Sequence, residues 1–420
     1  KLKLNDSKAT RWGALVIVAF TMMAAYYVND VVAPLKTMLE TDLAWSSTDF
    51  GFFTGGYSFL NVFFLMLIWG GLILDRFGIR FTGKLATILM VGGTALEYYA
   101  MTGLAGADAT LFGINEIFGY KTGVFVAFAG YSIFGVGAEV AGITVSKIIA
   151  KWFKGKELAT AMGVQVALAR IGSQAGYAVA IPLARAFGIS TPVLLGLVLL
   201  LGGMIAFFIF AVMDKKLDKQ MEAAAIAAGT EDEEEKFSFK DVKNILVNPG
   251  FWLIALLCVL FYSCVFPFQK FASELMIIKY GINENVAGTF AGLPALGALI
   301  LTPVFGGFID KRGKSASIML LGSAMLICVH FIYAIPDINY WLVAIVLMII
   351  LGIAFSLVPS AMWPAVAKIF PVSQLGTAYA LIFFIQNIGL WGIPTLIGWV
   401  LDAYCISGKK PDGTNMYDYT

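Results

Sequence analysis

Long apolar runs separated by short polar segments form the main pattern along the chain. A helix needs about 20 apolar residues to cross the roughly 30 Å hydrocarbon core of a bilayer, and eleven runs of this kind are present. The run at 194–210 lacks the two-residue alternation of a membrane β-barrel. Only helices satisfy their own backbone inside lipid, so the pattern predicts an all-α membrane protein. The expected spans cover 12–38, 50–74, 81–105, 122–150, 158–187, 191–213, 250–278, 286–309, 316–335, 340–368 and 374–401.

A long hydrophilic segment divides these spans into six before it and five after it. We expect a six-helix bundle over 1–213, a cytoplasmic linker over 214–248 and an incomplete helix bundle over 249–420. The loop after span 2 reads GGLILDRFGIR and the loop after span 8 reads GGFIDKRGKS, which indicates two related halves. Repeated halves joined by a long loop are typical of secondary transporters. A twelfth helix is therefore expected to be missing from the chain; a natural eleven-span protein is the alternative.

Positive charges collect in alternate loops. Among the short loops, Lys and Arg residues are concentrated in those after spans 2, 4 and 8, and the polar start of the chain adds four more. Because short cytoplasmic loops carry an excess of these residues, the N-terminus is predicted to be cytoplasmic. The protein is expected to be a multi-pass membrane protein. Short loops and the lack of an evident sorting signal favour a bacterial inner membrane over a lysosomal membrane.

Composition narrows the function classes. The chain is 59% hydrophobic and 13% charged, whereas soluble proteins carry about a quarter charged residues. A net charge of +2 does not indicate a nucleic-acid partner. Four scattered cysteines and one histidine give no metal-binding pattern, so no metal or cofactor is expected. The GKS at 313–315 lacks the glycine that a P-loop needs at 308, and no hydrolase motif occurs, so no enzyme is expected.

Charged residues inside the spans are candidates for a central site. Span 4 contains Glu139 and span 5 contains Arg170, both near the expected middle of the membrane. An isolated charge at that depth costs about 2.5–3.5 kcal/mol on insertion scales, so such residues line cavities or pair with each other. Span 1 contains Asp30 beside Tyr26, which indicates either cavity lining or a packing role.

The second half offers polar groups instead of a charged pair. In span 7, Pro267 is expected to kink the helix just before Gln269 and Lys270. In span 11, Gln386 and Asn387 form a polar pair in an apolar helix. These amides either read a substrate or hold neighbouring helices together.

The loop after span 2 carries a recognisable motif. Residues 71–80 read GLILDRFGIR, which resembles the GxLxDRxGxR signature loop of the major facilitator superfamily. An Asp beside a helix end and basic residues can form a charge network that breaks and re-forms as the halves move. A basic cytoplasmic turn without a gating role is the alternative. The residues assigned to this gate are Asp75, Arg76, Arg80, Asp310 and Arg312.

Several longer stretches resemble one branch of that superfamily, the lysosomal dipeptide transporter and its relatives. They are 57–80, 152–173, 261–268, 302–314 and, most clearly, 362–390. The resemblance implies two six-helix halves and transport of dipeptides. It also implies that the charged pair of that branch falls on Glu139 and Arg170, and its span 1 acid on Asp30. The residues after Asp30 and the pair Gln269–Lys270 depart from the pattern of that branch.

The physical chemistry of the charged pair agrees with that implication. A free dipeptide is a zwitterion, and Arg170 suits its carboxylate because a guanidinium binds bidentately. Glu139 suits its amine, and without substrate the two side chains are expected to pair. The expected activity is alternating-access transport of small zwitterions by a monomer surrounded by lipid. The alternative is a proton-coupled carboxylate or organic-anion carrier, in which Glu139 carries the proton; a transport-inactive sensor is a third class.

Overall fold

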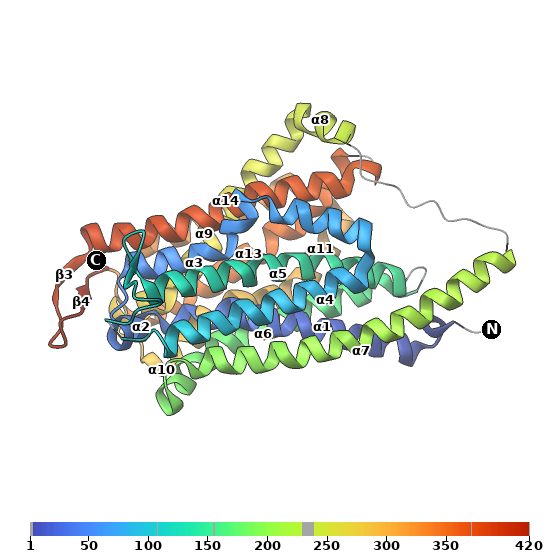
Figure 1. Ribbon diagram of the computed structural model, residues 1–420. Helices are drawn as coiled ribbons and strands as arrows, with labels where there is room; N and C mark the ends of the chain where they lie inside the picture. The colour runs from blue at the N-terminus through green and yellow to red at the C-terminus, as the bar shows by residue number, and fades with distance from the viewer. Residues whose placement is uncertain (1–2, 107, 154–155, 229–238, 371, 420) are drawn as a thin grey trace.

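The computed structural model describes residues 3–106, 108–153, 156–228, 239–370 and 372–419. Long helices lie side by side and form one elongated bundle (Figure 1). The N-terminus and the two helix ends that flank the linker lie at one end of the bundle, which we name the linker end. The short strands β3 and β4 and the helices α2 and α10 lie at the opposite end, which we name the strand end.

The first half of the chain forms seven helices and two short 3₁₀ turns in the described residues. The first predicted span becomes α1, a 3₁₀ turn at Pro34 and the short α2. The element bounds are η1 (Leu4–Asp6), α1 (Lys8–Val31), η2 (Ala33–Leu35), α2 (Lys36–Leu43), α3 (Ser47–Phe63), α4 (Met66–Thr102), α5 (Thr122–Trp152), α6 (Leu158–Phe187) and α7 (Thr191–Ala228).

Predicted spans 2 and 3 meet inside α4. The second span bends by 60° between α3 and the first turns of α4, where Leu65 has a φ of 53°. The third begins after Gly78, which has a φ of 76° and ψ of 175° that interrupt the helix. Only glycine adopts such a conformation without strain, so Gly78 of the signature loop separates the two spans.

The second half forms seven further helices in the described residues. The bounds are α8 (Phe239–Val247), α9 (Pro249–Ile278), α10 (Glu284–Ala291), α11 (Leu293–Arg312), α12 (Ser315–Ala334), α13 (Trp341–Ile369) and α14 (Val372–Tyr404). Helix α7 continues to Ala228 and α8 begins at Phe239, so part of the segment expected as a linker is helical. The domain boundaries themselves stay a prediction.

Two small antiparallel hairpins were not expected from the sequence. One pairs β1 (Glu116–Ile117) with β2 (Tyr120–Lys121), and the other pairs β3 (Ile406–Lys409) with β4 (Asn415–Tyr417). Gly119 and Gly413 turn the two hairpins with φ values of 82° and 85°. The second hairpin follows α14 and covers the strand end (Figure 1).

Eight helices of the described chain are long and apolar enough to cross a membrane, or nine when the bent pair of α3 and α4 is counted. The predicted spans at 81–105 and 158–187 are helical in α4 and α6 but are not among these. The apolar side chains form two large cores, one drawn almost wholly from the first half and one from the second. The all-α, two-part membrane fold expected from the sequence is thus present.

The halves approach most closely where α3 meets α14 near the strand end. A methyl group at Gly51 would overlap the carbonyl oxygen of Pro394, and one at Gly55 would lie 2.7 Å from that of Trp391. Gly398 faces the backbone of Ser47 in the same way. Small residues allow helix backbones to touch in a membrane, so these glycines set the contact between the halves.

Candidate functional site

Glu139 lies on α5 and is half-buried. Its Oε1 accepts a hydrogen bond of 2.9 Å from the Tyr57 hydroxyl on α3. One turn earlier on α5, Gly135 lies so close to Tyr57 that a side chain there would overlap the Tyr57 carbonyl oxygen. The missing side chain at Gly135 therefore brings the tyrosine beside the carboxylate and fixes the direction in which Glu139 points.

Arg170 lies on α6, half-buried between aromatic rings from both halves. Its guanidinium carbon is 5.7 Å from the centre of the Tyr26 ring on α1 and 5.0 Å from that of the Phe355 ring on α13. Two residues further on, Gly172 touches the backbone of α1 at Met23, which holds α6 against α1. Cation–π contacts of this kind favour a guanidinium over bare apolar walls.

Glu139 and Arg170 both belong to the described chain and do not form an ion pair with each other. The expectation that they pair without substrate is therefore wrong. The physical reason is that each has another partner: Tyr57 hydrogen-bonds the carboxylate, and the two rings hold the guanidinium. Tyr26 nevertheless lies close enough to Glu139, Arg170 and Asp30 to interact electrostatically with each of them. These four predicted residues therefore share one region.

Arg170 also borders a cavity between the halves. This cavity has a volume of about 260 Å³ and lies between α6 of the first half and α11 of the second. That volume is slightly below the usual 300–1,000 Å³ of small-molecule pockets. Its lining residues are Arg170, Ile171, Gln174, Ala175, Ala178, Leu296 and Leu299.

Asp30 and Lys270 form a buried ion pair that joins the two halves. The Lys270 Nζ on α9 lies 3.3 Å from Asp30 Oδ1 on α1, and both side chains are 10% exposed. Lys270 also donates to the Asn29 carbonyl and, at 3.2 Å, to the Tyr131 hydroxyl. The Asn29 amide donates to Asp30 at 2.9 Å. The pair is therefore part of a hydrogen-bonded cluster that needs both halves to be complete.

The remaining amides of the predicted site make their contacts within the second half, two with another helix and one with its own. Gln269 is buried and donates to the Ala291 carbonyl at 3.5 Å. Gln386 is buried with its Oε1 3.8 Å from the Cys258 sulfur, which donates to it. Asn387 donates to Phe383 at 2.9 Å, and its Oδ1 is buried without a partner. A substrate role for these three residues stays a prediction.

The predicted gate residues separate into distinct environments. Arg80 pairs with Asp214, at 3.0 Å, and with Asp218 on α7, and Lys151 on α5 binds the same two acids. These contacts stay within the first half. Arg76 and Arg312 are exposed, and their guanidinium carbons stand 5.5 and 5.3 Å from the rings of Phe77 and Phe308. The side chains of Asp75 and Asp310 lie outside the described part of the structure.

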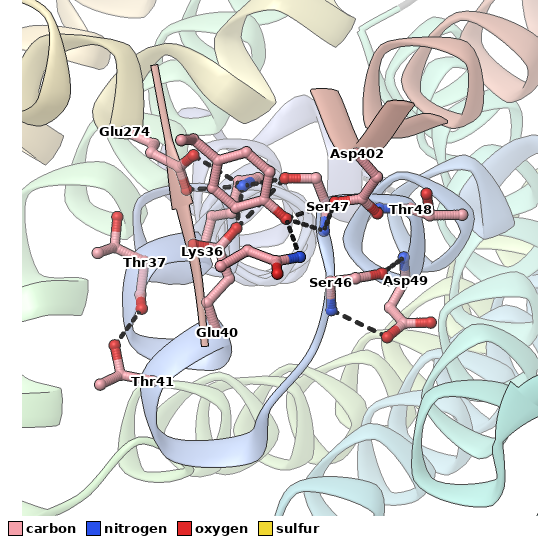
Figure 2. Close-up of polar contacts among 12 residues, drawn as sticks. Lys36, Thr37, Glu40, Thr41, Ser46, Ser47, Thr48, Asp49, Glu274 and Asp402 are labelled. Atoms are coloured by element: carbon pink, nitrogen blue, oxygen red, sulfur yellow. Dashed lines mark hydrogen bonds and ion pairs between the residues drawn. The ribbon is translucent and has the colours of Figure 1, made fainter. Parts of the chain in front are cut away.

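A second charge cluster, which the sequence reasoning missed, lies at the strand end (Figure 2). There Lys36 of α2 contacts Glu40 of the same helix and Glu274 of α9, the latter at 2.7 Å. Its Nζ also donates to Ser47 at 2.7 Å. These four residues are at most 2% exposed. Like the Asp30–Lys270 pair, the cluster joins the halves, and it does so nearer the strand end.

Helices of both halves thus enclose a central set of opposite charges, and buried ion pairs hold the halves together at one end. This arrangement defines a membrane transporter for small solutes, because each half can move against the other around a central site. The chain belongs to the Major Facilitator Superfamily, whose family model matches residues 15–392. It is accordingly a transporter and not an enzyme, as the sequence predicted.

Curated relatives support the resemblance that the sequence motifs indicated. The chain is 29% identical to the lysosomal dipeptide transporter MFSD1 of Homo sapiens, over 94% of this chain and 81% of that protein. It is 33% identical to the protein of the same name from Gallus gallus, over 65% of this chain and 62% of that protein. The predicted family and branch resemblance are confirmed.

Solved structures confirm the fold. A bacterial homologue of the human lysosomal transporter Spinster, in an inward-facing and unoccupied conformation, superimposes with a TM-score of 0.68 at 15% identity, covering 95% of this chain and 84% of that one. A single-residue mutant of the nucleoside transporter NupG gives 0.69 at 12% identity, covering 96% and 94%. A D-xylose–proton symporter gives 0.65 at 15% identity, covering 94% and 91%.

Proposed function

We propose that this protein transports dipeptides by alternating access, with Arg170 binding the substrate carboxylate and Glu139 its amine. The observation that carries the proposal is that these two opposite charges share one region and are not paired with each other. An extended chain spans about 3.3–3.6 Å per residue, so the charged termini of a dipeptide lie roughly 7 Å apart. Two separated side chains suit such a molecule better than a closed ion pair.

The aromatic residues around Arg170 add to this argument. Tyr26 and Phe355 flank the guanidinium from opposite halves. Because both rings contact the same side chain, binding at Arg170 is coupled to the relative position of the halves. The name of the relatives, lysosomal dipeptide transporter, supports the same substrate class.

The alternative is a proton-coupled carrier of carboxylates or other organic anions. It is favoured by the absence of any ion pair to Arg170 within the described chain, since an anion alone would satisfy that cation. In this case Glu139 carries the proton and its charge is not needed for binding. Glu139→Gln then changes only the pH dependence of uptake, whereas a dipeptide transporter loses binding of the substrate amine.

The same proposal sets the orientation and the setting. The linker end faces the cytoplasm, because basic residues such as Arg80, Lys151 and Lys156 collect there. The protein works as a monomer of two six-helix halves, in a bacterial inner membrane. In protein whose four native cysteines are replaced, a single cysteine placed at Lys216, an exposed position of α7, is tested with an impermeant maleimide in whole cells. Labelling from outside the cell would reverse the orientation.

Uptake into proteoliposomes tests the substrate and the site together. The purified protein is offered a mixed dipeptide set, free amino acids and dicarboxylates, with and without a pH gradient. We expect dipeptide uptake that Arg170→Ala abolishes and Arg170→Lys reduces, because lysine keeps the charge but loses the bidentate fork. Lys84→Ala is the matched control, since Lys84 lies against Phe208 away from the site. Intact uptake in Arg170→Ala would refute the site, and uptake of dicarboxylates alone would favour the alternative.

A further inference from the structure

The cluster at the strand end contains one more acid than base. Lys36 is 1% exposed, Glu40 2% and Glu274 1%. The Lys36 ammonium binds one oxygen of Glu40, both oxygens of Glu274 at 2.8 and 2.7 Å, and the Ser47 hydroxyl at 2.7 Å. One lysine is therefore shared between two carboxylates away from water. With all three groups charged, the cluster would hold a buried net charge of −1.

The surplus negative charge of the cluster falls on one oxygen atom of Glu40. Glu274 is well satisfied, because the Tyr419 hydroxyl donates to its Oε1 at 2.6 Å in addition to the two contacts with Lys36. Glu40 Oε2 is buried and has no hydrogen-bond partner. An ionised oxygen without a donor is costly in an interior that excludes water. A proton on Glu40 Oε2 neutralises the charge and lowers that cost, because a buried neutral group costs less than a buried unpaired charge.

The neighbouring hydroxyl on the same helix does not supply a partner for Glu40 Oε2. Thr37 precedes Glu40 by three residues on α2, and residues three apart are neighbours on a helix surface. The Thr37 hydroxyl oxygen is also buried without a partner. Because a threonine hydroxyl donates as well as accepts, two unpartnered atoms of this kind are not within hydrogen-bond distance of each other, and Thr37 does not satisfy Glu40 Oε2.

The other charged groups facing the cluster do not supply the missing positive charge at contact distance. Lys410, beyond β3, acts on Glu40 only through space. On α14, Asp402 accepts hydrogen bonds from the Thr48 amide, at 2.6 Å, and from the Tyr417 hydroxyl. The Tyr417 ring covers Lys36 at 4.7 Å from its Nζ. The hairpin of β3 and β4 thus closes the cluster from outside without neutralising it.

The position of the cluster gives the proton a mechanical role. Glu40 follows α1 in the first half, and Glu274 lies on α9 in the second, one turn beyond Lys270. Opening the strand end must separate these helices and expose both carboxylates to water, where each is stable as an anion. We propose that Lys36, Glu40 and Glu274 form a proton-binding gate, in which a proton on Glu40 closes the strand end and its release to water opens it. The proposal rests on the alternating-access function proposed above.

A distance measurement across the gate tests this proposal without any substrate. Spin labels are attached to Thr41→Cys at the exposed end of α2 and Asn283→Cys after α9, in full-length protein whose four cysteines are replaced, in lipid nanodiscs. We expect the short-distance population to increase as the pH falls from about 8.5 to about 5. One linked proton changes the closed-to-open ratio by up to about tenfold per pH unit.

Three variants make the result specific. Glu40→Gln should show the short distance at every pH, because its amide needs no proton to be neutral. Thr37→Val leaves the charges of the cluster unchanged and removes a hydroxyl that has no partner, so its transition should lie at the same pH as that of the parent. Asp42→Asn, an exposed acid on the same helix, should titrate like the parent. A parent protein whose distances do not change with pH would overturn the proposal, as would a Glu40→Gln variant that titrates normally.

The two proposals can fail separately. Because the spin-label distances need no cargo, they remain informative if the protein moves no dipeptide. Conversely, dipeptide uptake that depends on Arg170 while the distances ignore pH would refute the proton gate and leave the transport proposal standing.

Discussion

The Asp30–Lys270 pair offers the sharpest test of how the halves are held together. Lys270→Met removes the ammonium and keeps most of the side-chain volume. In the closed strand end this leaves the Asp30 carboxylate 10% exposed with only the Asn29 amide as a donor in the described chain. It also removes the donor to the Asn29 carbonyl and the Tyr131 hydroxyl. When the strand end opens, water reaches Asp30 and relieves the unpaired charge.

The structure sets the size of the effect. Breaking a buried ion pair by removing one partner costs about 3–5 kcal/mol, mostly from the charge left behind. Because opening relieves that free-energy cost, the substitution destabilises the closed state and not the open state. Each 1.4 kcal/mol is a factor of about ten in an equilibrium, so the open population should increase at least roughly 100-fold until it predominates.

Alkylation of a single cysteine at position 273, in protein whose four native cysteines are replaced, measures that population. Ser273 lies on α9 between Lys270 and Glu274, is 1% exposed and has an unpartnered hydroxyl, so Ser273→Cys fits the space. An impermeant maleimide reaches it only when the strand end opens. Lys270→Met should accelerate labelling about 100-fold or more, and adding Asp30→Asn should reverse most of the gain because no charge is then left unpaired. Equal rates in parent and Lys270→Met would refute the reasoning.

Three further outcomes follow from particular contacts. Tyr57→Phe removes a hydrogen bond to the Glu139 carboxylate, worth about 1.5–3 kcal/mol, so the dipeptide KM should increase at least tenfold with little change in maximal rate. Gly51→Leu forces α3 away from Pro394, so labelling of the position-273 cysteine should accelerate. Hydrogen bonds from an indole and an arginine of the N-terminal segment lower the pKa of Glu157 from 4.5 to about 2. These contacts should therefore persist from neutral pH and weaken only as the pH falls towards 2. Limited proteolysis of the N-terminal segment measures this loss.

Much of the fold could be predicted because lipid imposes simple rules on the sequence. The lengths of the apolar runs predicted the helices. The loop motif at 71–80 predicted the family, which the match over residues 15–392 confirms. Charges in apolar runs gave Glu139, Arg170 and Asp30. The depth of each residue in the membrane follows from its position along a span, without any tertiary information.

The partners of these charges could not be predicted, because depth does not give the direction in which a side chain points. Glu139 was expected to face Arg170 but is held by Tyr57, one of 16 tyrosines with no distinguishing sequence signal. Arg80 was assigned to a gate, yet its acids Asp214 and Asp218 looked like the start of a solvated linker. Only the continuation of α7 to Ala228 brings them beside α4 and α5.

The strand-end cluster was missed for a related reason. Lys36 and Glu274 are 238 residues apart in sequence, and each looked like an ordinary charge near the end of an apolar run. Their pairing depends on α2 and α9 meeting at the same level of the bundle. The signal that was present is weaker: a lysine and a glutamate four residues apart on one short helix, which is usually a surface pair.

The two ion pairs between α1–α2 and α9 explain how buried charges can both close the transporter and leave a site for its cargo. Along the first half the order is Asp30 then Lys36, and along α9 it is Lys270 then Glu274, so each charge meets its opposite in one register only. A slip by one turn would place Asp30 against Glu274, two anions. The register therefore defines a single closed arrangement. Arg170, held by rings and free of an ion pair in the described chain, is left to be neutralised by the carboxylate of a substrate.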